Sequence, residues 1–131
     1  MKAQDRVFET ALAELHAGAK RSHWMWFIFP QLRGLGSSST SQYYGLASLA
    51  EAQDYLKHSL LGPRLELCTR AVLAHPERSL LQIFGRPDDL KFLSSVTLFA
   101  AVSPVDNSPF HDALNRWHGG HGDPRTLALL K

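Results

Sequence analysis

Cysteine is nearly absent from this 131-residue chain, which contains only Cys68. One cysteine excludes an intramolecular disulfide and is typical of a reducing compartment, so we expect a cytoplasmic protein. Long apolar runs are absent as well. The longest, Trp24 to Phe29, has six residues, far fewer than a membrane span needs. The N-terminal residues follow an amphipathic helix pattern and not that of a signal peptide, so we predict no membrane partner.

Strong charge of either sign is also lacking. The chain has 14 Lys and Arg against 12 Asp and Glu, and its formal net charge is +2. The basic residues are scattered and form no dense block, so nucleic acid is disfavoured as a partner. The spacing His118-x-x-His121 near Asp123 resembles that of metal ligands. Gly119 and Gly120 place this pair at a helix end, however, where the spacing does not fix a shared face. We predict no metal site and no cofactor.

The pattern of apolar residues predicts helices throughout. Apolar positions recur at helical spacing, and no alternating strand pattern of useful length occurs. The length fits one domain covering residues 1–131. We therefore predict an all-α, mainly helical domain of six or seven helices, separated by a polar loop over residues 34–45. The expected helices cover residues 3–17 and 77–84 and begin near Ser48, Pro63, Asp88 or Asp89, Pro109 and Pro124.

Proline and cap residues mark several of these starts. Ser48-x-x-Glu51 matches a capping box. Ser108-Pro109 and Asp123-Pro124 each place a capping side chain before a proline at the first helical position.

The stretch KRSHWMWFIFPQ, residues 20–31, holds two of the three tryptophans. Its apolar middle fits either a buried strand or a buried helical turn, and the residue before Pro30 favours extended backbone, so any helix there ends by Ile28. Two interpretations compete. The stretch is a core segment with polar flanks, or an aromatic wall that holds a planar ligand beside Lys20, His23 and Gln31. We expect the apolar middle to be largely buried.

Three further features admit plain structural explanations. The segment GLGSSSTS, residues 34–41, lacks the lysine of a Walker loop, and a flexible polar loop is favoured. Cys68 falls on an apolar helix stripe and is expected to be a small buried hydrophobe. Ser94, Ser95 and Thr97 either serve the fold, by bonding to the preceding helical turn or by allowing close helix packing, or line a polar pocket with Lys91.

Four segments carry a family resemblance: GAKRSHWMWFIFPQLRGLG (18–36), EAQDYLKHSLLGPRL (51–65), IFGRPDDLKFLSSVTLF (83–99) and GDPRTLALL (122–130). Together they resemble the DUF1810 family, small bacterial proteins with an Rv1873-like helical fold and uncharacterised function. Some members carry the label calpastatin, which has no physical support in these residues. Three departures from the family pattern occur: a shortened lead before Ala3-Gln4, which can remove part of a wall or lid, Ser59 in a usual His-Pro, and Val96 in a usual Ser-Ser-Met-Thr.

The polar residues that this family pattern emphasises form our candidate site. If they converge, they make a cationic, hydroxyl-rich pocket with aromatic walls, suited to an anionic ligand with a planar part such as a nucleotide or an ADP-ribose-like metabolite. Hydrolysis of that ligand is a further option, and whether the protein is an enzyme stays open. The alternative is a non-catalytic protein-interaction module, in which the polar side chains cap helices and tie loops. The candidate catalytic residues are His23, His58 and Asp88, and the candidate ligand-binding residues are Lys20, Trp24, Trp26, Gln31, Arg64, Lys91, Ser94, Ser95 and Thr97.

Overall fold

The computed structural model describes residues 2–33, 45–105 and 107–130, with side chains from Gln4 onward. Within these ranges the secondary structure is helical, and the only strand-like feature is a parallel bridge between Leu32 and Leu46. The prediction of an all-α fold is confirmed. The helices are α1 (Lys2–His16), α2 (Met25–Ile28), α4 (Leu49–Lys57), α5 (Leu61–Leu73), α6 (Leu80–Phe84), α7 (Asp88–Val102), α8 (Pro109–Trp117) and α9 (Pro124–Leu129).

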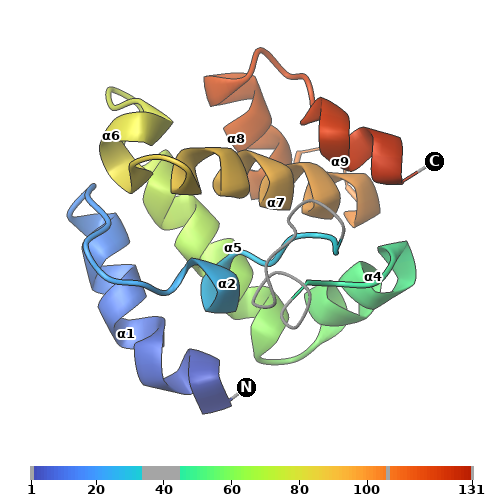
Figure 1. The fold of residues 1–131 in the computed structure, drawn as a ribbon, viewed down its shortest axis with the longest axis horizontal. Coiled ribbons are helices and arrows are strands. Elements are labelled where there is room, and N and C mark those ends of the chain that lie inside the picture. The colour runs from blue at the N-terminus through green and yellow to red at the C-terminus, as the bar shows by residue number, and fades with distance from the viewer. Residues whose placement is uncertain (1, 34–44, 106, 131) are drawn as a thin grey trace.

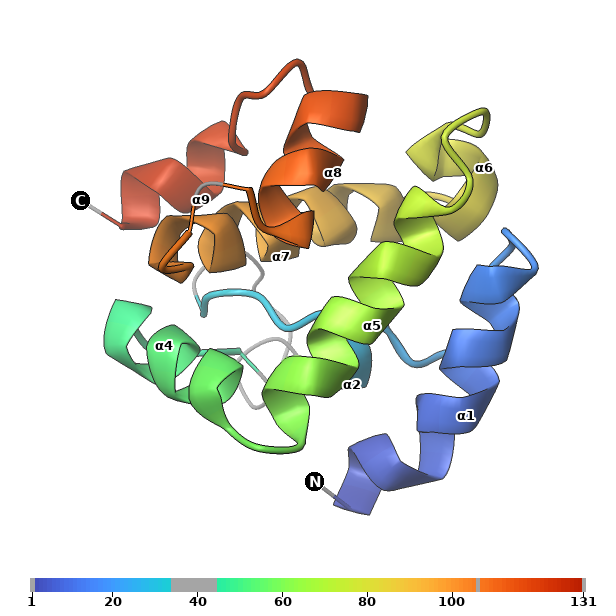
Figure 2. The same cartoon turned by 180° about the vertical axis from the view of Figure 1, so that it is seen from behind.

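Helix α7 runs through the middle of the molecule, and α5 crosses it (Figures 1 and 2). Helices α4, α6, α8 and α9 pack against α7, while α1 packs against α5. Buried side chains occupy an unbroken run of α7 from Ser94 to Ala100, as expected for a helix covered on all sides. The short α2 and the segment that leads into it lie between α1 and the first turn of α7, which positions the candidate site.

The aromatic run of the sequence is mostly core. Trp24, Met25, Ile28 and Phe29 are buried, whereas Trp26 is half-buried. The ring of Phe29 meets the rings of Phe84 and Phe92 edge-on, and these two rings stack on each other. The expected burial is confirmed, and the helical turn ends at Ile28 as predicted. None of the described helices is both long and apolar enough to span a lipid bilayer.

Most of the predicted helix starts are observed. The side chains of Ser48, Ser108 and Asp123 each accept a hydrogen bond from the backbone N–H three residues later. At Ser48 only this half of the predicted capping box is present. A complete capping box instead joins Ser79 and Gln82 at the start of α6.

Two predicted boundaries are wrong. The helix expected over 77–84 begins at Leu80, because Ser79 supplies the cap. The helix expected to begin near Pro63 begins at Leu61, since proline is tolerated throughout the first turn. Helix α7 begins at Asp88, at the expected position, although neither Asp88 nor Asp89 caps it. Pro87 occupies the cap position, so both aspartates lie in the first turn with their side chains free for other partners. The polar segment 34–41 lies outside the described residues.

Candidate anion-binding site

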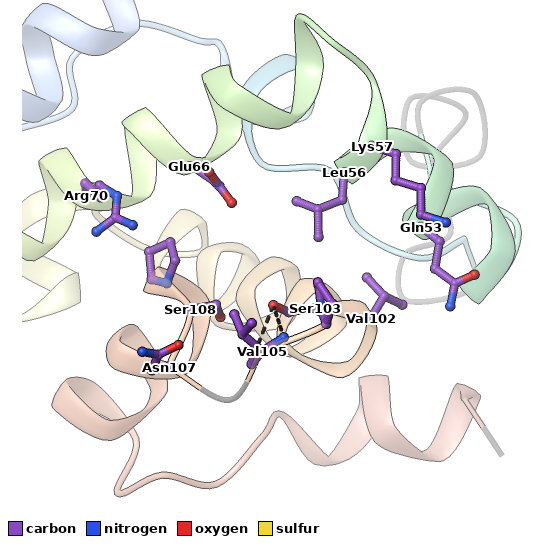
Figure 3. Close-up of a pocket in the computed structure, with 12 residues that line it drawn as sticks. Gln53, Leu56, Lys57, Glu66, Arg70, Val102, Ser103, Val105, Asn107 and Ser108 are labelled. Carbon is purple, nitrogen blue, oxygen red and sulfur yellow. Dashed lines mark hydrogen bonds between the residues drawn. The ribbon is translucent and has the colours of Figure 1, made fainter.

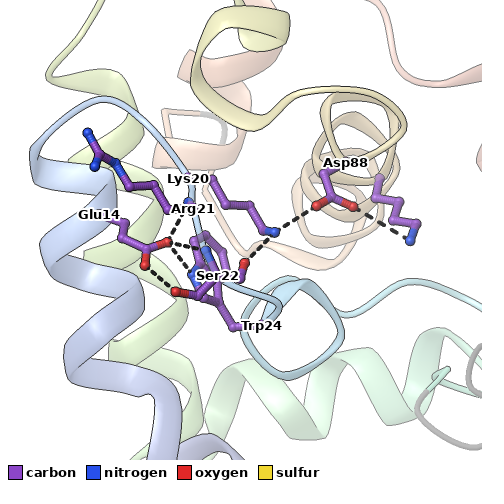
Figure 4. Close-up of polar contacts among 7 residues, drawn as sticks. Glu14, Lys20, Arg21, Ser22, Trp24 and Asp88 are labelled. Atoms are coloured by element: carbon purple, nitrogen blue, oxygen red, sulfur yellow. Dashed lines mark hydrogen bonds and ion pairs between the residues drawn. The ribbon is translucent and has the colours of Figure 1, made fainter.

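Two lysines share one carboxylate between the segment before α2 and the first turn of α7. The Nζ atom of Lys20 lies 2.9 Å from Oδ2 of Asp88, and Nζ of Lys91 lies 3.6 Å from Oδ1 of the same residue. Lys20 also donates a hydrogen bond to the carbonyl of Ser22 (Figure 4). Asp88 and Lys91 are three residues apart on α7, so one helical turn places them together. We call Lys20, Asp88 and Lys91 the lysine–aspartate cluster.

Each ammonium group of the cluster lies over an indole ring. Nζ of Lys20 is 5.1 Å from the centroid of Trp24, and Nζ of Lys91 is 4.4 Å from that of Trp26. Both distances are within the range of a cation–π contact. The side chains of Lys20, Asp88 and Lys91 retain 7%, 19% and 26% of their exposure. The cluster therefore carries a net positive charge in a partly desolvated, aromatic setting.

Glu14 fixes the segment that carries Lys20. Its Oε1 atom accepts hydrogen bonds from the backbone N–H groups of Arg21 and Ser22 and from the indole of Trp24, and its Oε2 accepts one from the Ser22 hydroxyl. Burial alone would raise the pKa of Glu14. The hydrogen bonds from Ser22, Arg21 and Trp24 outweigh burial and lower that pKa to about 2. Figure 4 shows this carboxylate on α1 facing the segment that follows Lys20.

Glu14 was not identified from the sequence as a partner of the Trp24 indole. The available signal was an acidic residue on the otherwise apolar side of a helix, ten positions before the tryptophan.

The predicted catalytic residues are not all brought together. Asp88 belongs to the lysine–aspartate cluster, whereas His58 lies between α4 and α5. There its Nδ1 accepts hydrogen bonds from the backbone N–H groups of Leu60 and Leu61, so His58 ties the α4–α5 turn to the start of α5. His23 is exposed before α2. The catalytic roles of these three residues stay predictions.

Arg64 ties α5 to α1. Its guanidinium donates to Oδ1 of Asp5 and Oε1 of Gln4 and lies 4.6 Å above the ring of Phe8. Gln4, which is buried, also donates to the carbonyl of Phe27. Gln4 is thus a second polar residue whose importance was missed, although the motif Ala3-Gln4 contained it.

The hydroxyl-bearing residues of α7 hold the start of α9. Ser94 donates to the carbonyl of Leu90 and to Oδ2 of Asp123. Thr97 donates to the carbonyl of Leu93 and accepts from the backbone N–H of Asp123. Bonding to the preceding turn was one of the two interpretations of these residues.

Ser95 and Gln31 are both buried, and they take no part in the contacts with Asp123. The Ser95 hydroxyl has no hydrogen-bond partner among the described residues. Gln31 is 7% exposed, and its backbone carbonyl accepts from Leu46 at the parallel bridge.

The histidines near the C-terminus form no metal cluster in the described part of the chain. No group of three or more His, Cys, Asp or Glu side chains lies close enough there to hold an ion. A ring nitrogen of His118 lies 2.6 Å from the backbone carbonyl oxygen of His121, at the end of α8. Cys68 is buried, and burial raises the pKa of its thiol to about 12.

Comparison with known proteins agrees with the sequence motifs. The family model described as "Protein of unknown function (DUF1810)" matches residues 1–130. The chain belongs to the DUF1810 family. It is similar to the crystal structure of the conserved hypothetical protein Rv1873 from Mycobacterium tuberculosis, with a TM-score of 0.94 and 53% identity over 98% of this chain and 91% of that one. No curated protein matches the chain. The predicted family and the Rv1873-like fold of this DUF1810 protein are confirmed.

Proposed function

We propose that this DUF1810 protein binds an anionic small molecule with a planar part, of the nucleotide or ADP-ribose type, at the lysine–aspartate cluster. One observation carries the proposal. A single carboxylate, that of Asp88, faces two ammonium groups, and each ammonium group rests on an indole. An anion would balance the remaining positive charge.

The two lysines have different parts in this proposal. Lys20 is the better buried, and it contacts both Asp88 at 2.9 Å and the carbonyl of Ser22. It serves as the fixed counter-charge of Asp88. Lys91 is more exposed, and at 3.6 Å from Oδ1 it is outside direct hydrogen-bond distance. Lys91 can therefore turn to a ligand anion while Asp88 keeps Lys20 as its partner.

The planar part of the ligand would lie near Trp26. This indole is half-buried, and Lys91 already marks one of its faces as accessible to a cation. Aromatic side chains with a few fixed polar groups are the usual lining of small-molecule sites. A ligand that joins an anion to a planar ring would use both Lys91 and Trp26, whereas a simple anion would use only Lys91.

The proposal concerns binding and includes no hydrolytic step. Asp88 is engaged with two lysines in the cluster, whereas His58 contacts backbone amides between α4 and α5, so the proposal assigns no proton transfer to either residue. As part of the same proposal we place the protein in the cytoplasm, since its lone cysteine is a buried thiol.

A non-catalytic protein-interaction module is the second candidate. It is favoured by the contacts of several candidate residues that serve the fold alone. His58 ties the α4–α5 turn to the start of α5, Arg64 ties α5 to α1, and Thr97 anchors the start of α9. This candidate predicts that no small anion stabilises the protein.

Thermal-shift measurements with ADP-ribose, AMP, adenosine and inorganic phosphate separate these candidates. A ligand present at about 100 times its dissociation constant stabilises a protein by about 2.7 kcal/mol, which corresponds to about 10 °C at this chain length. We expect ADP-ribose and AMP to give shifts of this kind and adenosine and phosphate to give smaller ones.

The variants Lys91→Met and Lys57→Met locate the effect. Lys57 is an exposed lysine on α4 without an ion pair among the described residues, so it is the matched control. We expect Lys91→Met to abolish the shift and Lys57→Met to retain it. The absence of a shift with all four compounds, or a full shift in Lys91→Met, would contradict the proposal.

A further inference from the structure

A pocket of about 680 Å³ lies away from the lysine–aspartate cluster, between α4, α5 and the connection from α7 to α8 (Figure 3). Its size is that of a site for an ordinary small molecule. Its lining combines an apolar part, with Leu56, Val102 and Val105, and the charged side chains of Lys57, Glu66 and Arg70.

Glu66 and Arg70 are the distinctive pair of this pocket. They lie four residues apart on α5, so they project from the same face of the helix. Figure 3 shows both side chains reaching toward the α7–α8 connection. A glutamate four residues before an arginine ordinarily favours an ion pair. Here neither side chain forms an ion pair with the other or with any other residue that the structure describes. A negative and a positive charge therefore lie on one helix face, and both can bind a ligand.

The apolar side chains continue from this charged pair. In Figure 3, Leu56 extends into the middle of the pocket, on the side of Glu66 opposite to Arg70. Val102 and Val105 lie across from it, and Val105 is 51% exposed. Covering such apolar surface favours binding. A ligand that bridges the charged pair and then extends an apolar group toward Leu56 would satisfy both parts of the lining.

We propose that this pocket binds a free α-amino acid with a large apolar side chain. The guanidinium of Arg70 receives the α-carboxylate, because its planar donors match a carboxylate. Glu66 receives the α-ammonium, and the side chain of the ligand lies against Leu56, Val102 and Val105. A carboxylic acid without an amine leaves Glu66 uncompensated beside the bound anion, and an amine without a carboxylate leaves Arg70 in the same state.

The test is a calorimetric titration of the full-length protein with three matched probes: L-leucine, N-acetyl-L-leucine, which lacks the ammonium, and L-leucinamide, which lacks the carboxylate. L-Phenylalanine serves as a second amino acid. We expect both amino acids to bind, and each blocked probe to bind at least tenfold more weakly than L-leucine.

Two substitutions then test which side chain recognises which charged group of the amino acid. Glu66→Gln should weaken L-leucine binding tenfold or more and remove the disadvantage of N-acetyl-L-leucine. Arg70→Met should likewise weaken L-leucine and remove the disadvantage of L-leucinamide. Glu9→Gln, at an exposed position on α1 that does not line the pocket, should leave L-leucine binding within twofold, and Val105→Trp, which fills the pocket at an exposed position, should abolish it.

Three results would overturn the proposal: no binding of either amino acid to the wild-type protein, equal binding of L-leucine and N-acetyl-L-leucine, or L-leucine binding unchanged in both charge variants. A circular-dichroism spectrum and a melting curve of each variant confirm that it is folded. All of these outcomes are independent of the lysine–aspartate cluster, because Lys91→Met should bind L-leucine as the wild type does.

Discussion

The carboxylate of Glu14 should contribute a large part of the stability near the lysine–aspartate cluster. Replacing it by alanine removes the acceptor of three N–H groups and one hydroxyl. A hydrogen bond to a charged group contributes about 1.5–3 kcal/mol. The indole of Trp24 is 1% exposed and cannot turn to water, whereas the exposed Arg21 amide can. We count the hydrogen bond of the indole in full and the other three in part. On this basis Glu14→Ala should lower the free energy of unfolding by about 3 kcal/mol, or the melting temperature by about 10 °C.

The isosteric variant Glu14→Gln separates charge from hydrogen bonding. Its amide oxygen can replace Oε1, so the loss at neutral pH should be smaller, about 1–2 kcal/mol. The pKa of Glu14 is lowered to about 2 from an ordinary 4.5. A lowered carboxyl pKa adds stability that is complete above the ordinary value and is lost as the pH falls toward the lowered one. The stability difference between wild type and Glu14→Gln should therefore shrink steadily between these two values.

Melting temperatures recorded from neutral to acidic pH test this prediction. Glu9→Gln is the matched control, because Glu9 is an exposed glutamate on the same helix. We expect its melting curve to follow that of the wild type at every pH. A Glu14→Gln protein as stable as the wild type at neutral pH, or a difference that stays constant on acidification, would refute the role assigned to this carboxylate.

Three further predictions follow from single contacts. Gly62→Ala should cost more than about 3 kcal/mol in chemical denaturation, because a Cβ atom there would clash with the backbone carbonyl oxygen of Leu56. Unchanged stability would contradict it. Cys68 should react with a disulfide reagent at about pH 8 far more slowly in the native protein than in urea, since burial raises its thiol pKa to about 12; equal rates would contradict its burial. Thr97→Val should cost about 1–2 kcal/mol and speed proteolysis beyond α8, because the amide of Asp123 loses its acceptor, and an unaltered cleavage rate would contradict that anchoring.

Local signals predicted the fold well where one residue decides the outcome. Ser108 and Asp123 cap helices as their sequence neighbours indicated, and Pro30 limits α2 to Ile28. The errors arose where two signals compete. Asp88 is a good capping residue, yet Pro87 occupies the cap position, and the side chain of Asp88 contacts two lysines. Such a choice depends on tertiary contacts, which the order of residues does not state.

The candidate site was predicted in part for the same reason. Lys20, Asp88, Lys91 and the two tryptophans do meet, although Lys20 and Asp88 are far apart in the sequence. The amphipathic patterns identify which side chains are polar in a buried setting, but not whether a polar side chain serves a ligand or the backbone. The role of His58 at the start of α5, and the placement of Glu66 and Arg70 in one pocket, required the folded structure.

Calorimetric titration of ADP-ribose into wild-type and Lys91→Met protein tests the central claim most directly. In the lysine–aspartate cluster Lys91 lies over Trp26, while Lys20 balances the charge of the Asp88 carboxylate. We predict saturable binding to the wild type and at least tenfold weaker binding to Lys91→Met, with both proteins equally folded. Equal affinities of the two proteins, or no heat of binding to the wild type, would contradict the assignment of this cluster as the anion site.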